Sequence, residues 1–400
     1  MITSKDKYIF IPLVFLLMGF MISDYKVLCN LVGSITTLIL LIYTKGNCGN
    51  NYYDCKNTRY YVLFLVYYTI TSLFNFNIYS WFVYFLFYLI LFCPFMLYRY
   101  IENRRNVSLA KTIIVIFFII WTVFCLLSIK SCIEVPNLAR MMAAYRPSFK
   151  DVINGGGYPM GYGAAILSGY LFYLILYRKV KNGFLKSIII LELAIMFFMV
   201  SLINSFIIFF GLLLSYAINI INRNTKGPLI LVYIVLGIIA IITYFFIGDI
   251  LLFIAHNTSD ELMHKRWMEI YNTIILGSNS NHVDDRQLMY DISFNSFIQS
   301  PIIGVGYKFG NIFALGDLKY IGNHSTILDT LAQFGIIGAI PVFHFLLYPY
   351  RRNRRLKYDS SYLVPFAFMA CFNPIFTCFH AMLIVYLIIP LIQLLRHNDK

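Results

Sequence analysis

Long apolar stretches separated by short polar segments run through almost the whole chain. A helix needs roughly 20 mostly apolar residues to cross a membrane, and this pattern predicts twelve such spans. We expect an all-α polytopic membrane protein in which residues 1–400 form one integral membrane domain. The predicted spans are residues 8–22, 27–43, 60–76, 78–97, 111–129, 158–177, 187–201, 203–221, 229–247, 324–347, 361–376 and 379–394.

Two polar segments, residues 130–157 and 248–323, are much longer than the others. Five predicted spans precede the first of these segments and nine precede the second, so both segments fall on the same side of the membrane, opposite the two termini. Long loops carry function more often than they carry packing. We therefore expect the chemistry of this protein on the side where these two segments lie.

Composition and charge support this topology. The chain is 60% hydrophobic and 12% charged, whereas soluble domains carry about 25% charged residues. Most of the 32 basic residues fall in the short loops on the side of the termini, as the positive-inside rule requires for a cytoplasmic side. The net charge of +14 therefore reflects membrane orientation, and we expect no nucleic-acid partner.

No cofactor motif is visible in the sequence. The eight cysteines are scattered without the spacing of a disulfide framework, and Cys48 and Cys55 have no nearby histidine with which to bind zinc. The glycines Gly304 and Gly306 suggest part of a dinucleotide fingerprint, but no strand–helix–strand unit surrounds them. We expect neither a cofactor nor a metal ion.

The first long segment contains two arginines and a glycine run that suit an anionic ligand. Arg140 and Arg146 precede Pro147, and the run ends at Gly157, where the missing side chain lets backbone approach a ligand closely. An arginine offers a planar fork of donors that matches phosphate oxygens. For Arg140 we favour contact with lipid headgroups, and for Arg146 both interpretations stay open.

The second long segment contains a predicted helix and a tight turn. The helix begins near Asp284 and Asp285, carries Arg286 at its N-terminal end and ends before Pro301. The turn follows at Gly304 and Gly306. One face of this helix is expected to be apolar. It consists of Leu288, Ile292, Phe294 and Phe297.

His324 stands where the second segment meets a span. Ser325 can cap the following helix, and Asp329 lies in its first turns. A single histidine at such a position is usually a local hydrogen-bonding group, but an imidazole can also act as a general base near neutral pH. His256 and His282 are weaker candidates for that role.

Two acids, Glu192 and Asp329, fall within predicted spans. Charges inside a membrane are expensive and usually functional. Asp329 lies near the outer end of its span and is expected to reach the chemistry of the outer loops. Glu192 lies deeper, where a functional role would fit a transporter. The two long segments thus combine arginines with His324 beside membrane spans. This combination suits the transfer of a glycan from a lipid-linked pyrophosphate.

The chain resembles the bacterial O-antigen polymerase and ligase superfamily. The resemblance rests on the predicted topology, on Arg146 and Gly157 in the first segment, and on a group of residues in the second. That group is Arg286, Pro301, Gly304, Gly306, His324, Leu328, Gly335 and Gly338. The chain departs from the family where many members have His-Asn and this sequence has His324-Ser325, and where many carry an arginine in the central spans.

The resemblance implies a GT-C-like, metal-independent glycosyltransferase in the bacterial cytoplasmic membrane. Its substrate would be an undecaprenyl-pyrophosphate-linked oligosaccharide, with a chain-length regulator as an expected protein partner. His324 and Arg286 would be catalytic. The substrate would be bound by Arg140, Arg146, Gly157, Gly304, Gly306 and Asp329.

The resemblance leaves three activities open. A repeat-unit polymerase is the first, and a ligase that transfers finished glycan to another acceptor is the second. A flippase for lipid-linked glycan is the third, although such a protein should line its interior with many more charged residues than this sequence provides.

Overall fold

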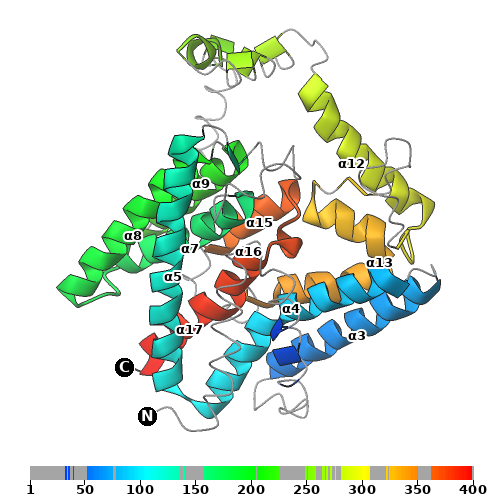
Figure 1. Ribbon diagram of the computed structural model, residues 1–400, viewed down its shortest axis with the longest axis horizontal. Helices are drawn as coiled ribbons and strands as arrows, with labels where there is room; N and C mark the ends of the chain where they lie inside the picture. Colours follow the sequence, from blue (N-terminus) through cyan, green and yellow to red (C-terminus); the bar gives the residue numbers. More distant parts are fainter. Residues whose placement is uncertain are drawn as a thin grey trace.

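A computed structural model shows a bundle of helices (Figure 1). It describes residues 52–74, 78–135, 157–203, 205–224, 251–257, 281–306, 324–349 and 362–398, together with isolated positions elsewhere. Within these residues nearly every position is helical and none forms a strand. The all-α fold class predicted from the sequence is confirmed.

The helices follow the apolar stretches closely. Six of the described helices are long and apolar enough to cross a membrane, which fits a polytopic membrane protein. The predicted spans 8–22 and 229–247, and most of 27–43, lie outside the described residues, so the total of twelve remains a prediction. The α-helices are α3 (Tyr52–Phe74), α4 (Ile78–Arg104), α5 (Val107–Glu134), α7 (Tyr158–Leu176), α8 (Gly183–Leu202), α9 (Phe206–Asn224), α12 (Asn281–Gln299), α13 (Thr326–Leu346), α15 (Leu363–Phe372), α16 (Phe379–Leu383) and α17 (Ile389–Asn398).

One predicted span is shorter than expected. Residues 361–376 were predicted to cross the membrane, but α15 ends at Phe372, about 15 Å of helix and half the thickness of a bilayer core. Asn373 adopts an extended conformation, and Pro374 has no N–H to continue the helix. A short 3-10 turn, Ile375–Thr377, then leads into α16, which continues through a π-helical turn into α17.

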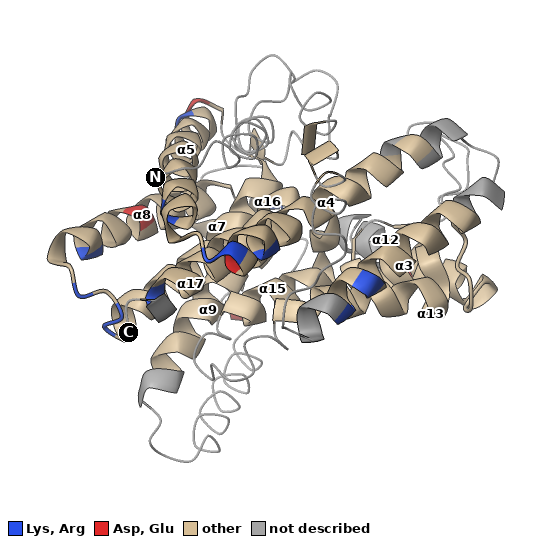
Figure 2. Ribbon diagram, turned by 90° about the horizontal axis from the view of Figure 1, so that it is seen from below, with Lys and Arg blue, Asp and Glu red and all other residues tan. Residues whose placement is uncertain are grey.

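Several of the described basic residues gather at one end of the bundle. Arg104 and Arg105 join α4 to α5 there, and Arg178 and Lys179 follow α7. Arg396 lies at the same end, where its guanidinium approaches the hydroxyl of Tyr170 at 3.4 Å. Figure 2 looks onto this end. The opposite end, where α7, α13 and α16 begin, is the one that the sequence predicts to face outward.

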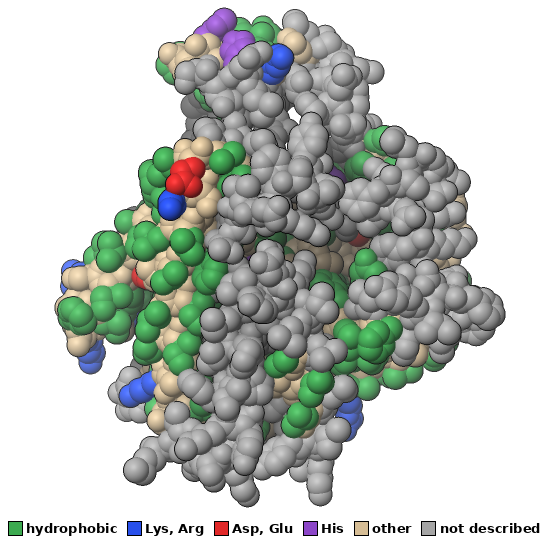
Figure 3. Space-filling model, viewed as in Figure 1, with side chains coloured by type: hydrophobic (Ala, Val, Ile, Leu, Met, Phe, Trp, Pro, Cys, Tyr) green, Lys and Arg blue, Asp and Glu red, His purple; other side chains and the backbone are tan. Residues whose placement is uncertain are grey.

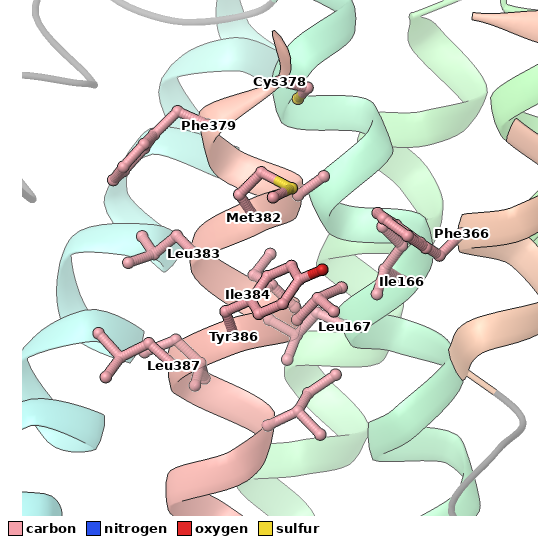
Figure 4. Close-up of a cluster of buried hydrophobic side chains, with 14 of the residues drawn as sticks. Ile166, Leu167, Phe366, Cys378, Phe379, Met382, Leu383, Ile384, Tyr386 and Leu387 are labelled. Atoms are coloured by element: carbon pink, nitrogen blue, oxygen red, sulfur yellow. The ribbon is translucent and has the colours of Figure 1, made fainter. Parts of the chain in front are cut away.

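Helix α7 lies at the centre of the fold. It packs against α8, α9, α15 and α16, and most of its side chains are buried. Ile166 and Leu167 meet Phe366 of α15 and the side chains of Met382 and Tyr386 in an apolar cluster (Figure 4).

Helices α12, α13 and α3 form a second packed group beside this core (Figure 1). Phe334 of α13 is buried against the rings of Phe64 and Tyr68 of α3. Helix α12 lies along the first half of α13. This second group carries the residues that the sequence analysis singled out.

Candidate functional site

The helices that follow the two long polar segments begin beside one connector, residues 373–378. Gly157 forms the N-cap of α7, and the carbonyl of Pro159 accepts a hydrogen bond from the thiol of Cys378 at 3.4 Å. The N-terminus of α13 contacts the other end of the connector. The fold therefore brings Gly157 and His324 to the same end of the bundle, although 166 residues separate them in the sequence.

Thr326, directly after Ser325, fastens α13 to this connector. Its N–H and its hydroxyl both donate to the carbonyl of Asn373, at 3.1 and 2.8 Å, and its hydroxyl oxygen accepts from the N–H of Phe376 at 3.3 Å. The break between α15 and α16 thus supplies the partners that the first turn of α13 needs. Both the backbone and the side chain of Thr326 therefore hold the start of α13 against the connector.

His324 has a defined tautomer in this setting. Its Nδ1 lies 2.9 Å from the carbonyl oxygen of Gly322, and the side chain is half-buried. A carbonyl oxygen can only accept, so Nδ1 carries the proton that is donated. In the neutral ring Nε2 then holds the lone pair, which is the arrangement that a general base requires.

Asp329 organises the backbone on both sides of His324. Its Oδ2 accepts from the N–H of Ser325 at 2.9 Å, and its Oδ1 accepts from the hydroxyl of Ser293 on α12 at 2.6 Å. The Ser293 oxygen in turn accepts from the N–H of Gly322 at 2.8 Å. One buried carboxylate is therefore linked to the residue after His324 directly and to Gly322 through a serine.

A reciprocal cap completes the start of α13. The Ser325 hydroxyl accepts from the N–H of Leu328 at 3.3 Å, while the Asp329 carboxylate accepts from the N–H of Ser325. This is the logic of a capping box, displaced by one residue. The predicted capping role of Ser325 is confirmed.

Gly304 and Gly306 lie at a break in α13. Gly335 has φ +59° and ψ −171°, which interrupts the helix between Phe334 and Ile336. The turn residues Gly304 and Gly306 also have positive φ, 79° and 66°. A Cβ on Gly304 would overlap the backbone of Gln333 and Gly335, so only glycine permits this approach.

The remaining predicted site residues lie partly outside the described structure. Arg140 and Arg146 are outside it. Arg286 lies in the N-terminal part of α12, and its side chain is outside the described part, as is that of His282. His256 lies at the end of the described segment 251–257, next to His264.

Glu192 lies apart from this site, between α8 and α5. Its Oε1 is hydrogen-bonded to the hydroxyl of Thr122, and its Oε2 is buried without a partner among the described residues. Glu192 thus contacts a neighbouring span instead of the residues around His324.

Sequence reasoning missed Ser293, Gly322 and Tyr67. Ser293 and Ser296 are buried on α12, whereas Leu288 and Phe294 of the predicted apolar face are exposed. A helix that buries serines and exposes large apolar side chains cannot be recognised from periodicity alone. The spacing of Ser293 and Ser296, three residues apart, was the sequence signal that could have identified the buried face of α12.

The described geometry defines a polytopic helical membrane protein with a histidine held at one end of its bundle. Residues 189–343, which run from α8 through most of α13 and include His324, match the family model Wzy_C, described as O-Antigen ligase. This match is consistent with the O-antigen polymerase and ligase superfamily that the motifs indicated. No curated protein matches the chain.

In the described part of the chain, no three His, Cys, Asp or Glu side chains lie close enough together to hold a metal ion. Asp329 and His324, at the start of α13, are instead hydrogen-bonded to backbone and serine groups. The groups at hand for chemistry at this end of the bundle are an imidazole and the N-terminal ends of helices.

Proposed function

We propose that this protein is a repeat-unit polymerase for a lipid-linked glycan. A glycan would be transferred from an undecaprenyl-pyrophosphate carrier to a hydroxyl of another lipid-linked repeat unit. The observation that carries this proposal is the His324 geometry inside a domain of the O-antigen polymerase and ligase superfamily. Both substrates are lipid-linked, which suits a protein built almost wholly from membrane helices.

In the proposed reaction His324 is the general base. Its Nε2 takes the proton of the acceptor hydroxyl while that oxygen attacks the anomeric carbon of the donor. The bond between that carbon and the pyrophosphate oxygen breaks, and the pyrophosphate leaves with the bonding electrons. Arg286 and Arg146 are proposed to stabilise the charge that develops on the leaving group, with Arg140 contributing at its margin.

Gly157, Gly304 and Gly306 are proposed to act through the backbone. Gly157 begins α7 beside the connector 373–378, where a substrate phosphate can approach the first N–H groups of a helix. Gly304 and Gly306 hold the turn against α13, so we propose that they support the loop that carries His324. Contact of these glycines with the substrate remains a prediction.

Asp329 is better suited to positioning than to binding substrate. Its two oxygens already accept hydrogen bonds from Ser325 and Ser293, and its side chain is buried. We therefore propose that it keeps the His324 loop in register rather than contacting the glycan. This revises the role that the sequence suggested for it.

A ligase is the second candidate, because the matching family model is described as O-Antigen ligase. The two activities share a donor and a base and differ in the acceptor. A ligase would transfer the finished glycan once to a different acceptor molecule, whereas a polymerase would use a fresh repeat unit repeatedly.

Reconstitution separates these activities. The purified protein is placed in liposomes with one undecaprenyl-pyrophosphate repeat unit as both donor and acceptor, and the glycans are resolved on a gel. A ladder of products is expected. A single unchanged band, followed by one new product when a glycolipid acceptor is added, would replace the polymerase with the ligase.

The orientation and the protein partner belong to the same proposal. We propose that the end marked by Arg104 and Arg178 faces the cytoplasm, so that the His324 end faces outward in the inner membrane. A chain-length regulator added to the liposomes would then shift the modal length of the ladder. It would not be required for the ladder to form.

A further inference from the structure

The segment that follows α12 enters the break in α13. On one side of the break, the N–H groups of Val305 and Gly306 donate to the carbonyls of Ala332 and Gln333, at 2.9 and 3.0 Å. On the other side, the hydrogen bonds run in the opposite direction. The N–H of Ile336 donates to Pro301 at 2.8 Å, and that of Ile337 donates to Ile302 at 3.2 Å. The turn therefore replaces the helical hydrogen bonds that Gly335 interrupts.

This contact lies deep within a span. Gly335 is near the middle of α13, a helix long and apolar enough to cross a membrane. At 1.5 Å per residue, the break is about 14 Å along the helix from Thr326, roughly half the thickness of a bilayer core. Tyr67, in the outer half of α3, contacts the same point.

The irregular backbone at this depth has partners for its carbonyl groups. Those of Pro301 and Ile302 accept from α13, that of Ile303 accepts from the Tyr67 hydroxyl at 2.5 Å, and that of Gly304 accepts from the Ser300 hydroxyl at 2.9 Å. Backbone outside a helix is tolerated in hydrocarbon only when its polar groups are satisfied within the protein. The turn meets this requirement for four successive carbonyls.

The outward surface of the turn is apolar and continues the surface of the span beside it. Ile302 and Ile303 are exposed, and so are Ile336, Ile337 and Ile340 of α13. The N–H of Ile337 donates to the carbonyl of Ile302, so the turn and α13 lie side by side there. The exposed isoleucines of the turn and of α13 therefore face the same medium. Ile298, one residue before the end of α12, is exposed as well.

The exposed polar residues of α12 are consistent with this placement. Asp291 and Asn295 are each two residues from Ser293 along the helix. The hydrogen bond from Ser293 to Asp329 places this part of α12 at the level of the α13 N-terminus. Gln299 is the polar exception at the deep end, and it is uncharged. Charge is therefore kept toward the headgroup level, and the deepest side chains are isoleucines.

We propose that the C-terminal end of α12 and the turn Pro301–Gly306 form a re-entrant element within the membrane. Its side chains Ile298, Ile302 and Ile303 contact the acyl chains of the outer leaflet. Part of the segment predicted as a single outer loop, 248–323, thus lies within the bilayer. This inference does not depend on the glycan reaction.

Three positions of nearly equal exposure provide the test. Ile302 is 60% exposed, Ile119 in the middle of α5 is 60% exposed, and the side chain of Glu134 at the outer end of α5 is 61% exposed. Each is changed to cysteine in a full-length, cysteine-free background whose activity has been verified, and each carries a nitroxide spin label in liposomes. The label's collisions with membrane-soluble oxygen and with a water-soluble nickel complex are then measured.

The label of Ile302→Cys is expected to match that of Ile119→Cys, with high oxygen and low nickel accessibility. The label of Glu134→Cys is the aqueous reference, with the opposite ratio. A nickel accessibility at Ile302→Cys close to that of Glu134→Cys would overturn the proposal, because the turn would then lie in water. Low accessibility to both reagents would also overturn it, since a protein surface would then cover the isoleucines.

Discussion

At the scale of single residues, the proposed base and the groups that hold it are separate. His324 is held by one hydrogen bond to Gly322, whose own N–H reaches Asp329 through Ser293. The imidazole is thus held by the backbone carbonyl of Gly322, two residues earlier in the chain. The Asp329 carboxylate acts on that backbone and not on the ring itself. Variants of the base and of its support should therefore have different kinetic consequences.

Replacement of the base should stop extension. We expect His324→Ala to abolish the product ladder while leaving membrane abundance unchanged, because the side chain is half-buried and makes one local contact. Arg286→Ala should act in the same way if this arginine meets the pyrophosphate. Normal ladders from both variants at wild-type abundance would contradict the catalytic assignment.

Replacement of the support should lower turnover without removing it. Ser293→Ala breaks the link between Gly322 and Asp329, and a hydrogen bond to a charged group is worth about 1.5–3 kcal/mol. We expect kcat to fall roughly tenfold for a loss of about 1.4 kcal/mol in transition-state stabilisation, with little change in KM. Steady-state extension rates in liposomes measure both quantities.

Two variants control for simple damage to the fold. Ser296→Ala removes a second buried serine from the same face of α12, one turn away, and should leave kcat unchanged. Ser293→Thr keeps the hydroxyl and should retain most of the activity. Equal losses in Ser293→Ala and Ser296→Ala would assign the effect to packing instead of positioning.

At the scale of elements, α13 is a helix in two halves joined by a turn from another segment. The apolar stretch 324–347 predicted its existence and its ends to within two residues. The break at Gly335 was not predicted, since an isolated glycine in an apolar run is common in membrane helices. What makes this glycine structural is the approach of Pro301–Gly306, a long-range contact that local periodicity does not encode.

Gly335 should tolerate no side chain. In Gly335→Ala, the positive φ costs about 1–2 kcal/mol for an L-residue, and the new Cβ would overlap the carbonyl of Ile302. We expect a lower melting temperature in detergent and less folded protein. Gly183→Ala is the matched control, because a Cβ there meets nothing within 4 Å, and it should melt like the wild type.

Tyr67 should stabilise the break through its hydroxyl alone. Tyr67→Phe keeps the ring against Gly338 but leaves the carbonyls of Ile303 and Phe334 without this donor. We expect a loss of about 1–3 kcal/mol for the unsatisfied groups, seen as a lower melting temperature. Tyr60→Phe, on the same helix and stacked on His344, should have a smaller effect; the reverse order would contradict the role of the hydroxyl.

At the scale of the whole molecule, the sequence predicts the spans better than the site. Hydropathy is local, so the ends of α7 could be predicted to within one residue, and the existence of α5 and α8 could be predicted although their ends differ by up to five residues. The contact of the α7 N-terminus with the 373–378 connector could not be predicted, because it depends on how α7, α13 and α16 pack. Predicting the roles of Ser293 and Gly322 would likewise have required knowing that α12 faces α13 with its serines.

The proposed reaction uses side-chain cations in place of a metal ion, which makes chelation a test of the whole site. We expect the product ladder in liposomes to be unchanged after treatment with EDTA, because arginines and helix ends would meet the charge on the leaving pyrophosphate. A loss of extension that is restored by adding a divalent cation would contradict the metal-independent assignment.

The double contact of the Tyr67 hydroxyl also concerns how the chain is made. Its two acceptors, Ile303 and Phe334, are 236 and 267 residues further along the chain. At about 5–20 residues per second, the first of them leaves the ribosome roughly ten seconds to a minute after α3. Asn373, to which Thr326 donates, lies 47 residues beyond Thr326 and is synthesised later still. The two halves of α13 can therefore settle only when synthesis is nearly complete, and until then the inserted early helices must remain open to receive them.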